Sequence, residues 1–251
     1  MKNAVVLLAY NTTRDQLDLT KKAVDSIFAQ DVEGGIHLWA VDNGSGIETT
    51  RWLKDLQALE GHEIQKTFYE TNQSPVRLAN ELAGSLFETG YPYILGVSND
   101  CVLPTNLYTE MLKCPRGVVA AWMTADEIEP VQPPAKTVHE DCHMSVSLTR
   151  SWAHDALVER YGHFFDPGFF LYGSDVDFKL RLAALGIHGA QLDILVNHYG
   201  SACWRLAIPS VAREINAKAD VDRTFFAKKW GFGIDQHGPY LTDINFRGEP
   251  K

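Results

Sequence analysis

Long apolar runs are missing from this chain of 251 residues. The first run, from Ala4 to Ala9, is much shorter than a signal-peptide core or the stretch of about 20 residues that a membrane span needs. No later segment approaches membrane-spanning length. We therefore expect a soluble protein without a membrane span, and we interpret the first apolar run as a buried strand.

Cysteine is scarce, and positive charge is in deficit. The four cysteines include no C-x-x-C pair, which argues against a zinc knuckle or a redox motif. A reduced, cytoplasmic compartment is the simplest interpretation. The net charge of −9 argues against a generally basic surface for nucleic acid, although it leaves room for a local basic patch.

Three widespread nucleotide and hydrolase motifs are also absent. The chain has no G-x-G-x-x-G after its first strand-like run and no G-x-x-x-x-G-K-[ST]. It also lacks the G-x-S-x-G nucleophile elbow. These absences argue against the dinucleotide fingerprint, a P-loop protein and an α/β-hydrolase.

Strand-like and helix-like stretches alternate through the first half of the chain. Apolar runs that are typical of buried strands cover residues 4–10, 36–46, 63–70 and 91–100. Helical spacing is found over residues 17–30, 48–59 and 74–90. This βαβαβαβ order predicts an α/β fold with a mostly parallel, doubly wound sheet and helices on both faces.

The second half is less regular. Strands are indicated at 117–124, 143–150 and 190–200, and helices at 151–162, after residue 174 and at 210–231. Residues 127–141 contain three prolines and several charges, which favours a loop. With no internal repeat, the pattern indicates one continuous domain with a C-terminal helical appendage that ends at Gly231 or Gly233.

Polar side chains follow several of the expected strands. The first strand ends in Tyr10-Asn11-Thr12, the second in Asp42-Asn43-Gly44-Ser45, and the fourth in Ser98-Asn99-Asp100. Any one of these groups is explained by turn chemistry alone. Because ligands of open α/β sheets bind outside the carboxyl ends of the strands, three such groups at one edge favour a binding site. His198 follows another apolar run, and with Asp100 it offers oxygen and nitrogen ligands for Mn²⁺ or Mg²⁺.

Two acids stand at the start of an expected helix, in FFLYGSDVDFKLRLAALG (169–186). Ser174 is placed to cap this helix, with Asp177 at the third helical position as in a capping box, and a functional role for Asp177 is equally open. Residues two apart diverge by roughly 200° on a helix, so Asp175 and Asp177 do not serve one point. Asp175 is therefore left as a candidate general base, kept ionised by the helix dipole.

Seven segments in order carry a resemblance to a known family. They are LLAYNTTRDQLDLTKKAVDSIFAQ, WAVDNGSG, NQSPVRLAN, YILGVSND, FFDPGFFLYGSDVDFKLRLAALG, VNHYGS and FFAKKWG. Together, from about Val5 to Gly231, they resemble the family 2 glycosyltransferases of the GT-A fold. The resemblance implies a nucleotide-sugar-binding half at 1–104, an acceptor and catalytic half of the same domain at 105–204, and a helical tail at 205–251.

The resemblance also assigns expected roles to residues. Tyr10 and Asn11 match the lining of the nucleotide pocket, and Asp42 matches the acid that contacts the base or ribose of the donor. Asn72, Arg77 and Asn80 match the segment that packs near the sugar nucleotide. Ser98-Asn99-Asp100 occupies the place of the D-x-D metal motif, so Asn99 is expected at the donor, and Asp100 and His198 are expected to bind the metal. Asp175 matches the catalytic base of inverting members.

The implied function is an inverting, metal-dependent transfer of a sugar from a nucleotide-diphosphate donor, most readily a UDP-sugar, to an acceptor hydroxyl. Serines at 98, 174 and 74 and an alanine at 79 depart from the family pattern. They motivate the alternative of a catalytically silent module that binds sugar nucleotides or glycans. A nucleotidyltransferase is disfavoured, because AYNTTRD has one arginine and no glycine to hold a triphosphate.

The acceptor implied by the resemblance is a surface polysaccharide, a small molecule or a modified base in DNA, and no oligomeric state is implied. A basic stripe on the last helix would suit DNA, although a solvated helix face is the preferred interpretation of these charges. The residues concerned are Arg213, Lys218, Arg223, Lys228 and Lys229.

Overall fold

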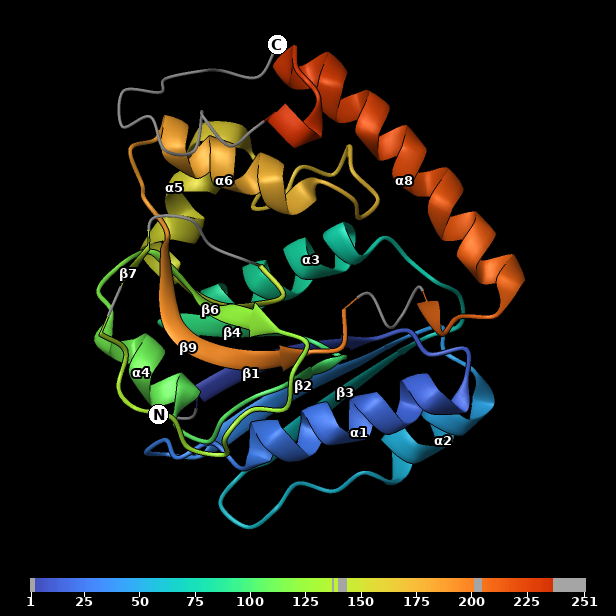
Figure 1. The fold of residues 1–251 in the computed structure, drawn as a ribbon, viewed down its shortest axis with the longest axis vertical. Coiled ribbons are helices and arrows are strands. Elements are labelled where there is room, and N and C mark those ends of the chain that lie inside the picture. The colour runs from blue at the N-terminus through green and yellow to red at the C-terminus, as the bar shows by residue number, and fades with distance from the viewer. Residues whose placement is uncertain (1–2, 137, 140–143, 201–204, 237–251) are drawn as a thin grey trace.

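The computed structural model describes residues 3–136, 138–139, 144–200 and 205–236. In these ranges one sheet of nine strands lies between layers of helices (Figure 1). The strands are β1 (Asn3–Ala9), β2 (Ile36–Asn43), β3 (Glu63–Tyr69), β4 (Tyr93–Ser98), β5 (Cys101–Val102), β6 (Val118–Thr124), β7 (Val138–His139), β8 (Val146–Arg150) and β9 (Ala190–His198).

The strand order is β3-β2-β1-β4-β8-β6-β9-β5, and β7 also pairs with β9. The four strands β3, β2, β1 and β4 are mutually parallel, and the chain winds outward from β1 in both directions. Strands β6 and β9 are parallel to each other, whereas β5, β7 and β8 run antiparallel to their neighbours. The expected α/β fold with a mostly parallel, doubly wound sheet is therefore confirmed, and the short strand β7 lies inside the segment that was expected to be a loop.

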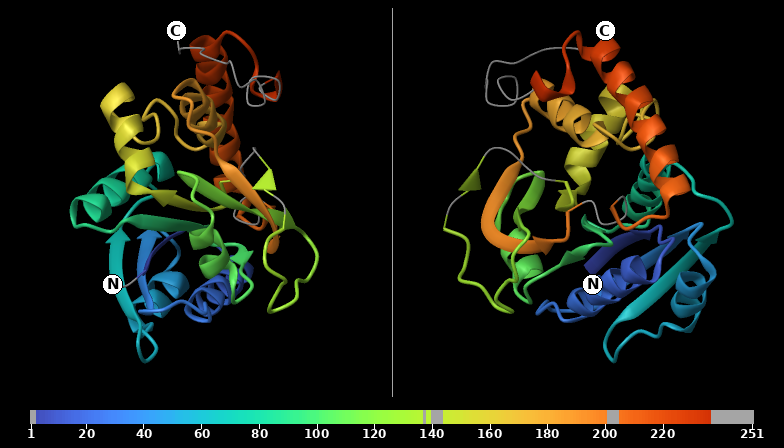
Figure 2. Two further views of the ribbon diagram at one scale, coloured as in Figure 1. Left: turned by 90° about the vertical axis from the view of Figure 1, so that its left-hand side faces the viewer. Right: turned by 45° about the vertical axis from the view of Figure 1, so that its right-hand side comes forward.

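Helices cover both faces of the sheet (Figures 1 and 2). On one side lie α1 (Arg14–Phe28), α2 (Ile47–Asp55) and α4 (Leu107–Lys113). On the other side lie α3 (Pro75–Glu88), α5 (Ser151–Tyr161) and α6 (Ser174–Ala184). The long helix α8 (Pro209–Trp230) and a short 3₁₀ helix (Ile234–Gln236) complete the described chain.

Successive side chains of β1 pack into two different hydrophobic clusters, one on each face of the sheet. Val5, Leu7 and Ala9 belong to the hydrophobic cluster that includes α1 and α4. Ala4 belongs to the second cluster, with residues of α3, α5 and α6. Because successive side chains of a strand point to opposite faces, a strand that is covered on both sides reads as a continuous apolar run. This explains why the first run of the sequence is apolar without alternation.

One sheet joins the two halves that were expected to meet at residue 104. Strand β4 of the first half pairs with β8 of the second, from Tyr93 opposite Arg150 to Val97 opposite Val146. The roles expected for 1–104, 105–204 and 205–251 remain predictions. Within the described residues, no helix is both long enough and apolar enough to cross a membrane.

Helix α8 is packed against the rest of the protein through its C-terminal half. Phe226 and Trp230 are buried in a third hydrophobic cluster with Phe169 and with Val176 and Leu180 of α6. The helix ends at Gly231, which has a left-handed φ of 82° and donates its N–H to Ala227 O. The expected C-terminal helix and its glycine stop are confirmed.

Asp177 does not belong to a capping box, and that expectation was wrong. The N-cap of α6 is Gly173, no side chain caps the helix, and the Ser174 hydroxyl donates to Leu171 O. The Asp177 carboxylate is instead fully buried, 2.8 Å from Arg181 Nε and 2.6 Å from Lys229 Nζ. Trp230 Nε1 also donates to it at 2.9 Å. The local sequence suggested that Asp177 caps the start of α6, whereas Lys229 and Trp230 of α8 bind its carboxylate.

The charges around Asp177 extend to a second acid. Lys229 also pairs with Asp166. Burial alone would raise the pKa of the Asp166 carboxyl, but the hydrogen bonds from Lys229 and from the backbone of Gly168 outweigh it and lower that pKa. Burial lowers the pKa of the nearby His163, and the charge of Arg181 lowers it further. The negative charges of Asp166 and Asp177 thus neutralise the positive charges of Arg181 and Lys229 where α6 meets α8.

The isosteric replacement Asp177→Asn should lower the free energy of unfolding by about 3 to 5 kcal/mol, because it leaves the buried Arg181 without an acidic partner among the described residues and removes one of the two acids that pair with Lys229. Asp175→Asn is the matched control, two residues away on a half-buried side chain, and should change stability by less than about 0.5 kcal/mol. Urea unfolding of both variants measures the difference. Equal stability of the two variants would contradict the assigned role of Asp177.

Candidate functional site

The carboxyl ends of three parallel strands meet at one edge of the sheet. Ala9 of β1 lies opposite Asp42 of β2, and Leu8 lies opposite Ser98 of β4. Tyr10 and Asn99, which follow these strands, therefore stand at the same edge. The expectation that the polar strand ends converge is confirmed by the register.

Asn11 and Asn99 are joined beneath this edge. Asn99 Nδ2 donates to Asn11 Oδ1 at 2.9 Å and to Thr20 Oγ1 at 3.1 Å. Asn11 Nδ2 donates to the same Thr20 oxygen at 2.9 Å, and Asn11 is 1% exposed. These bonds tie β1, α1 and β4 together. Their observed role is to hold the edge, and the expected donor contacts of Asn11 and Asn99 remain predictions.

Asp42 shapes the turn after β2. Its Oδ1 accepts the backbone N–H of Ser45 at 2.9 Å, and its Oδ2 accepts the Thr50 hydroxyl at 2.6 Å. Asp42 is 1% exposed, so both of its oxygens are engaged inside the protein. Gly44 has a φ of 78°, and a Cβ there would lie 2.5 Å from the backbone carbon of Thr71. The turn therefore requires glycine, and the expected contact of Asp42 with the donor remains a prediction.

Asn43 connects the turn to the segment before α3. Its Nδ2 donates to Asn72 Oδ1 at 2.9 Å, and its Oδ1 accepts Gln73 N–H at 2.8 Å. Asn72 in turn bonds to the Tyr10 hydroxyl. The sequence pointed to Asp42 in the DNGS turn, whereas the structure shows that the neighbouring Asn43 holds Asn72, an expected donor contact.

Tyr10 lies where the edge of the sheet meets α8. Burial raises the pKa of its hydroxyl, the Glu214 carboxylate raises it further, and the bond to Asn72 lowers it in part. Glu214 belongs to α8, and the backbone N–H of Ile208, just before that helix, donates to the Thr12 hydroxyl at 3.4 Å. The last helix therefore reaches the end of the first strand.

Arg77 and Asn80 lie on α3 in different settings. Arg77 Nε pairs with Glu81 at 2.7 Å, and the arginine side chain is 64% exposed. Asn80 makes two bonds to the backbone of Phe165, at 2.8 and 2.7 Å. Arg77 remains available to a phosphate at the surface, whereas Asn80 holds the segment that leads toward α6.

Asp100 and His198 are brought together by the pairing of β5 with β9. In this antiparallel ladder Cys101 lies opposite His198, and Tyr199 N–H donates to Asp100 O. His198 Nε2 lies 3.4 Å from Asp100 Oδ1. Asp100 is 5% exposed, and the His198 side chain is 20% exposed. The proximity expected from sequence is therefore present, at the edge where β4 ends.

A hard divalent cation fits this group. The potential ligand atoms of Asp100, Cys101 and His198 all lie within 4.8 Å of one another. Burial raises the pKa of the Cys101 thiol, and the charge of Asp100 adds to the effect, so the thiol stays protonated and is a poor ligand. A carboxylate and an imidazole remain, and Mn²⁺ or Mg²⁺ commonly completes such a set with water and phosphate oxygens.

Asp175 is the second residue of α6, at the positive end of the helix dipole. It is half-buried, unlike Asp177, which is 0% exposed. No described residue forms an ion pair with it. The expected separation of the two acids is confirmed, while the role of Asp175 as a base remains a prediction.

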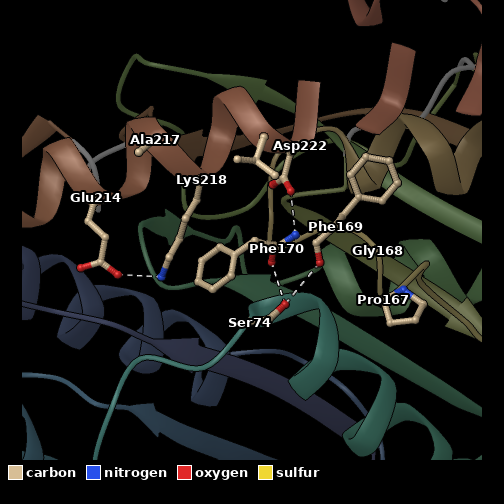
Figure 3. A pocket seen from close by; sticks show the side chains of 10 residues that line it. Ser74, Pro167, Gly168, Phe169, Phe170, Glu214, Ala217, Lys218 and Asp222 are labelled. Atoms are coloured by element: carbon tan, nitrogen blue, oxygen red, sulfur yellow. Dashed lines mark hydrogen bonds and ion pairs between the residues drawn. The ribbon is translucent and has the colours of Figure 1, made fainter. Parts of the chain in front are cut away.

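A groove of about 560 Å³ runs between α8, the segment 167–170 and the start of α3 (Figure 3). Its walls include Ser74, Phe170, Glu214, Lys218 and Asp222. Lys218 Nζ lies 3.8 Å from the centre of the Phe170 ring, and the same lysine pairs with Glu214 at 2.7 Å. The charge of Glu214 raises the pKa of the Tyr10 hydroxyl, so the two side chains lie near one another. The groove therefore adjoins the edge of the sheet.

The basic side chains of α8 do not form an open stripe. Lys218 pairs with Glu214, and Arg223 pairs with Asp220 at 2.6 Å. Lys229 is buried against Asp166 and Asp177. Three of the five basic residues considered in the sequence are therefore already neutralised by partners within the protein.

No family model matches the chain, and no curated protein sequence matches it. Solved structures do match. The mannosyltransferase PcManGT from Pyrobaculum calidifontis, in complex with GDP-Man and Mn²⁺, superimposes with a TM-score of 0.55 at 15% identity, over 97% of this chain and 73% of that one. TarS 1-349 of S. aureus in complex with UDP-GlcNAc gives 0.56 at 13%, over 94% and 74%.

Other TarS structures are matched over less of their length. This chain covers 58% of another TarS 1-349 structure, with a TM-score of 0.53, and 35% of a longer TarS chain. At 13–15% identity the similarity shows the fold alone. The chain thus has an α/β fold of the GT-A type, and its architecture resembles that of nucleotide-sugar glycosyltransferases.

Mn²⁺ should stabilise the wild-type protein, by about 2.7 kcal/mol at a hundredfold excess over its dissociation constant. Asp100→Asn should abolish most of this gain, because it removes the only charged ligand among the three grouped residues. Cys101→Ala is the matched control and should keep the gain. Thermal unfolding with and without Mn²⁺ measures the effect, and equal gains in all three proteins would refute this site.

Proposed function

We propose that this protein is an inverting, metal-dependent glycosyltransferase that moves a sugar from a nucleotide-diphosphate donor to an acceptor hydroxyl. The observation that carries the proposal is the pair Asp100 and His198, 3.4 Å apart at the carboxyl edge of a GT-A type sheet. Ligands of open α/β sheets bind at this edge. An oxygen and a nitrogen ligand from two strands suit a cation that meets a diphosphate there.

In this proposal the metal ligands and the nucleotide-binding residues have separate roles. Asp100 and His198 would hold Mn²⁺ or Mg²⁺, which when bound neutralises the charge that grows on the leaving diphosphate. Tyr10 and Asn72, joined by a hydrogen bond, line the place of the nucleotide. Arg77, exposed near the start of α3, is suited to a phosphate oxygen.

Asp175 takes the proton in the transfer step. The acceptor oxygen forms a bond to the anomeric carbon while the bond from that carbon to the diphosphate breaks. The acceptor proton moves to the Asp175 carboxylate, and the electron pair of the broken bond leaves with the nucleotide diphosphate. A single in-line displacement inverts the anomeric centre, and no covalent sugar–protein intermediate is needed.

We expect a uridine-diphosphate sugar to be the preferred donor and a guanosine-diphosphate sugar to be the next best. TarS has been solved with UDP and with UDP-GlcNAc, and PcManGT with GDP-Man and Mn²⁺. The acceptor is placed in the groove beside Phe170 and Lys218, which offers an aromatic face and polar groups to a glycan or small molecule. Residues 1–104 then serve the donor, 105–204 serve the acceptor and catalysis, and helix α8 of the tail forms a wall of the groove.

A catalytically silent module that binds sugar nucleotides is the second candidate. It is favoured by the serines at 98 and 174, which replace acids of the family pattern. It is also favoured by the burial of Asn11 and Asp42 in bonds within the protein. The pairing of Asp100 with His198 argues for turnover instead, because a passive module has no need to neutralise a leaving group.

Nucleotide release from a panel of UDP-, GDP-, dTDP- and CDP-sugars with Mn²⁺ tests the proposal. Wild-type protein should turn over at least one donor, with a UDP-sugar preferred. Asp175→Asn should lower kcat by about 10²- to 10⁴-fold with unchanged nucleotide affinity, because general-base catalysis contributes on this scale.

Asp55→Asn, at the exposed end of α2, is the control and should keep full activity. Tight nucleotide binding without turnover of any donor would favour the silent module. Full activity of Asp175→Asn would show that another group accepts the proton.

If DNA is offered as acceptor, transfer should depend weakly on salt, changing by less than about tenfold between 50 and 200 mM, because three of the five basic residues of α8 already have acidic partners. Binding through 6–10 phosphates would instead lose about 10³- to 10⁵-fold over this range. Initial rates at several salt concentrations decide between the two.

A further inference from the structure

We infer that Asp222, on α8, is a positioning residue whose carboxylate sets the shape of the segment 170–172 and thereby the place of Asp175. The inference rests on the proposed function, in which Asp175 is the base. It assigns to the last helix a part in the active site that neither the sequence nor the resemblance suggested.

Asp222 binds three successive backbone N–H groups. Its Oδ1 accepts from Phe170 at 2.8 Å, and its Oδ2 accepts from Leu171 at 2.9 Å and from Tyr172 at 2.8 Å. Asp222 is 2% exposed, and Figure 3 shows its carboxylate directed from α8 toward the backbone at Phe170. An ionised acceptor makes each of these bonds stronger than a neutral one would, and three donors satisfy most of its need for partners.

The same segment is held from α3 as well. The Ser74 hydroxyl donates to Phe170 O at 2.8 Å, on the opposite side of the peptide from Asp222 (Figure 3). Ser74 also caps α3 by accepting Arg77 N–H. The backbone at Phe170 is therefore fixed between the start of one helix and the middle of another.

Two glycines flank this segment, one facing α8 and one facing the 3₁₀ helix that follows α8. A Cβ at Gly168 would lie 2.3 Å from the Phe225 ring. A Cβ at Gly173, whose φ is 77°, would lie 2.6 Å from Ile234. A side chain at Gly168 would force the Phe225 ring to shift, and Gly173 has a backbone conformation that favours glycine.

The segment leads directly into the proposed base. Tyr172 is the last residue held by Asp222, Gly173 is the N-cap of α6, and Asp175 is the second residue of that helix. The position of Asp175 is therefore set from two sides: by Asp222 through the backbone before α6, and by the buried contacts of Asp177 within α6. Because α8 supplies Asp222, Lys229 and Trp230, one helix fixes both.

Asp222→Asn tests the inference, with Asp220→Asn as the matched control. Asparagine keeps the shape but has one acceptor oxygen, so at least one of the three N–H groups loses its partner. Asp220 lies two residues away, is 74% exposed and pairs only with Arg223 among the described residues. Each variant is measured by amide hydrogen exchange over residues 169–173, by UDP binding with Mn²⁺, and by nucleotide release from the best donor of the panel.

We expect exchange over 169–173 to rise at least tenfold in Asp222→Asn, and kcat to fall at least tenfold, while donor KM and UDP affinity stay within twofold. Asp220→Asn should match wild type in all three. A role in folding alone would lower the amount of folded protein without this division between kcat and KM.

Unchanged exchange, or faster exchange with unchanged kcat, would overturn the inference. If Asp222→Asn does not fold, wild-type protein still decides: the amides of residues 170–172 should exchange as slowly as those of α6, and rapid exchange there would refute the contact. If wild-type protein turns over no donor, the proposed function fails, whereas the exchange data still decide whether Asp222 holds the segment.

Discussion

Two residues of β5 pair with the last residues of β9, and this short antiparallel ladder joins the two halves of the candidate site. It places Asp100, which follows β4, beside His198, which ends a strand nearly a hundred residues later. Cys101 of β5 and Ile194 and Val196 of β9 belong to the main hydrophobic cluster. The ladder is therefore held by the core as well as by its hydrogen bonds. Without this pairing Asp100 and His198 would not lie beside one another at this edge.

The remaining polar residues at that edge divide between scaffold and surface. Asn11 and Asn99 join the ends of β1 and β4, Asp42 holds the turn after β2, and Asn43 holds the segment before α3. Buried polar groups are costly unless they are paired, so a dense network is what allows so many of them to gather at one edge. Tyr10, Arg77 and Asp175 are half-buried or exposed, and their expected roles at the donor and as a base remain predictions.

Helix α8 closes the protein on the side of α3 and α6. Its inner face combines an apolar contact through Phe226 and Trp230, a carboxylate of Asp222 that accepts backbone N–H groups, and the ion pairs of Lys229. Apolar burial gives such a contact most of its stability, and the charged bonds give it direction, because they fix which backbone groups lie opposite which side chains. The backbone just before α8 contacts Thr12 at the end of β1. The same helix binds the segment that leads into α6, so it reaches from the edge of the sheet to α6.

Sequence alone missed the short elements β5, α4 and β7, but it determined the order of the longer strands and helices, the convergence of the polar strand ends, and the candidate pair of Asp100 and His198. These features follow from local periodicity and from the rule that parallel strands share one carboxyl edge. Tertiary structure alone decided the use of Asp177, of Asn43 and of Asp222. Each carboxylate or amide took partners distant in the chain, 52 residues away for the Asp177–Lys229 pair, and no local pattern encodes such a choice. A turn, a cap and a buried counter-ion use the same residue types, so only the folded surroundings distinguish them.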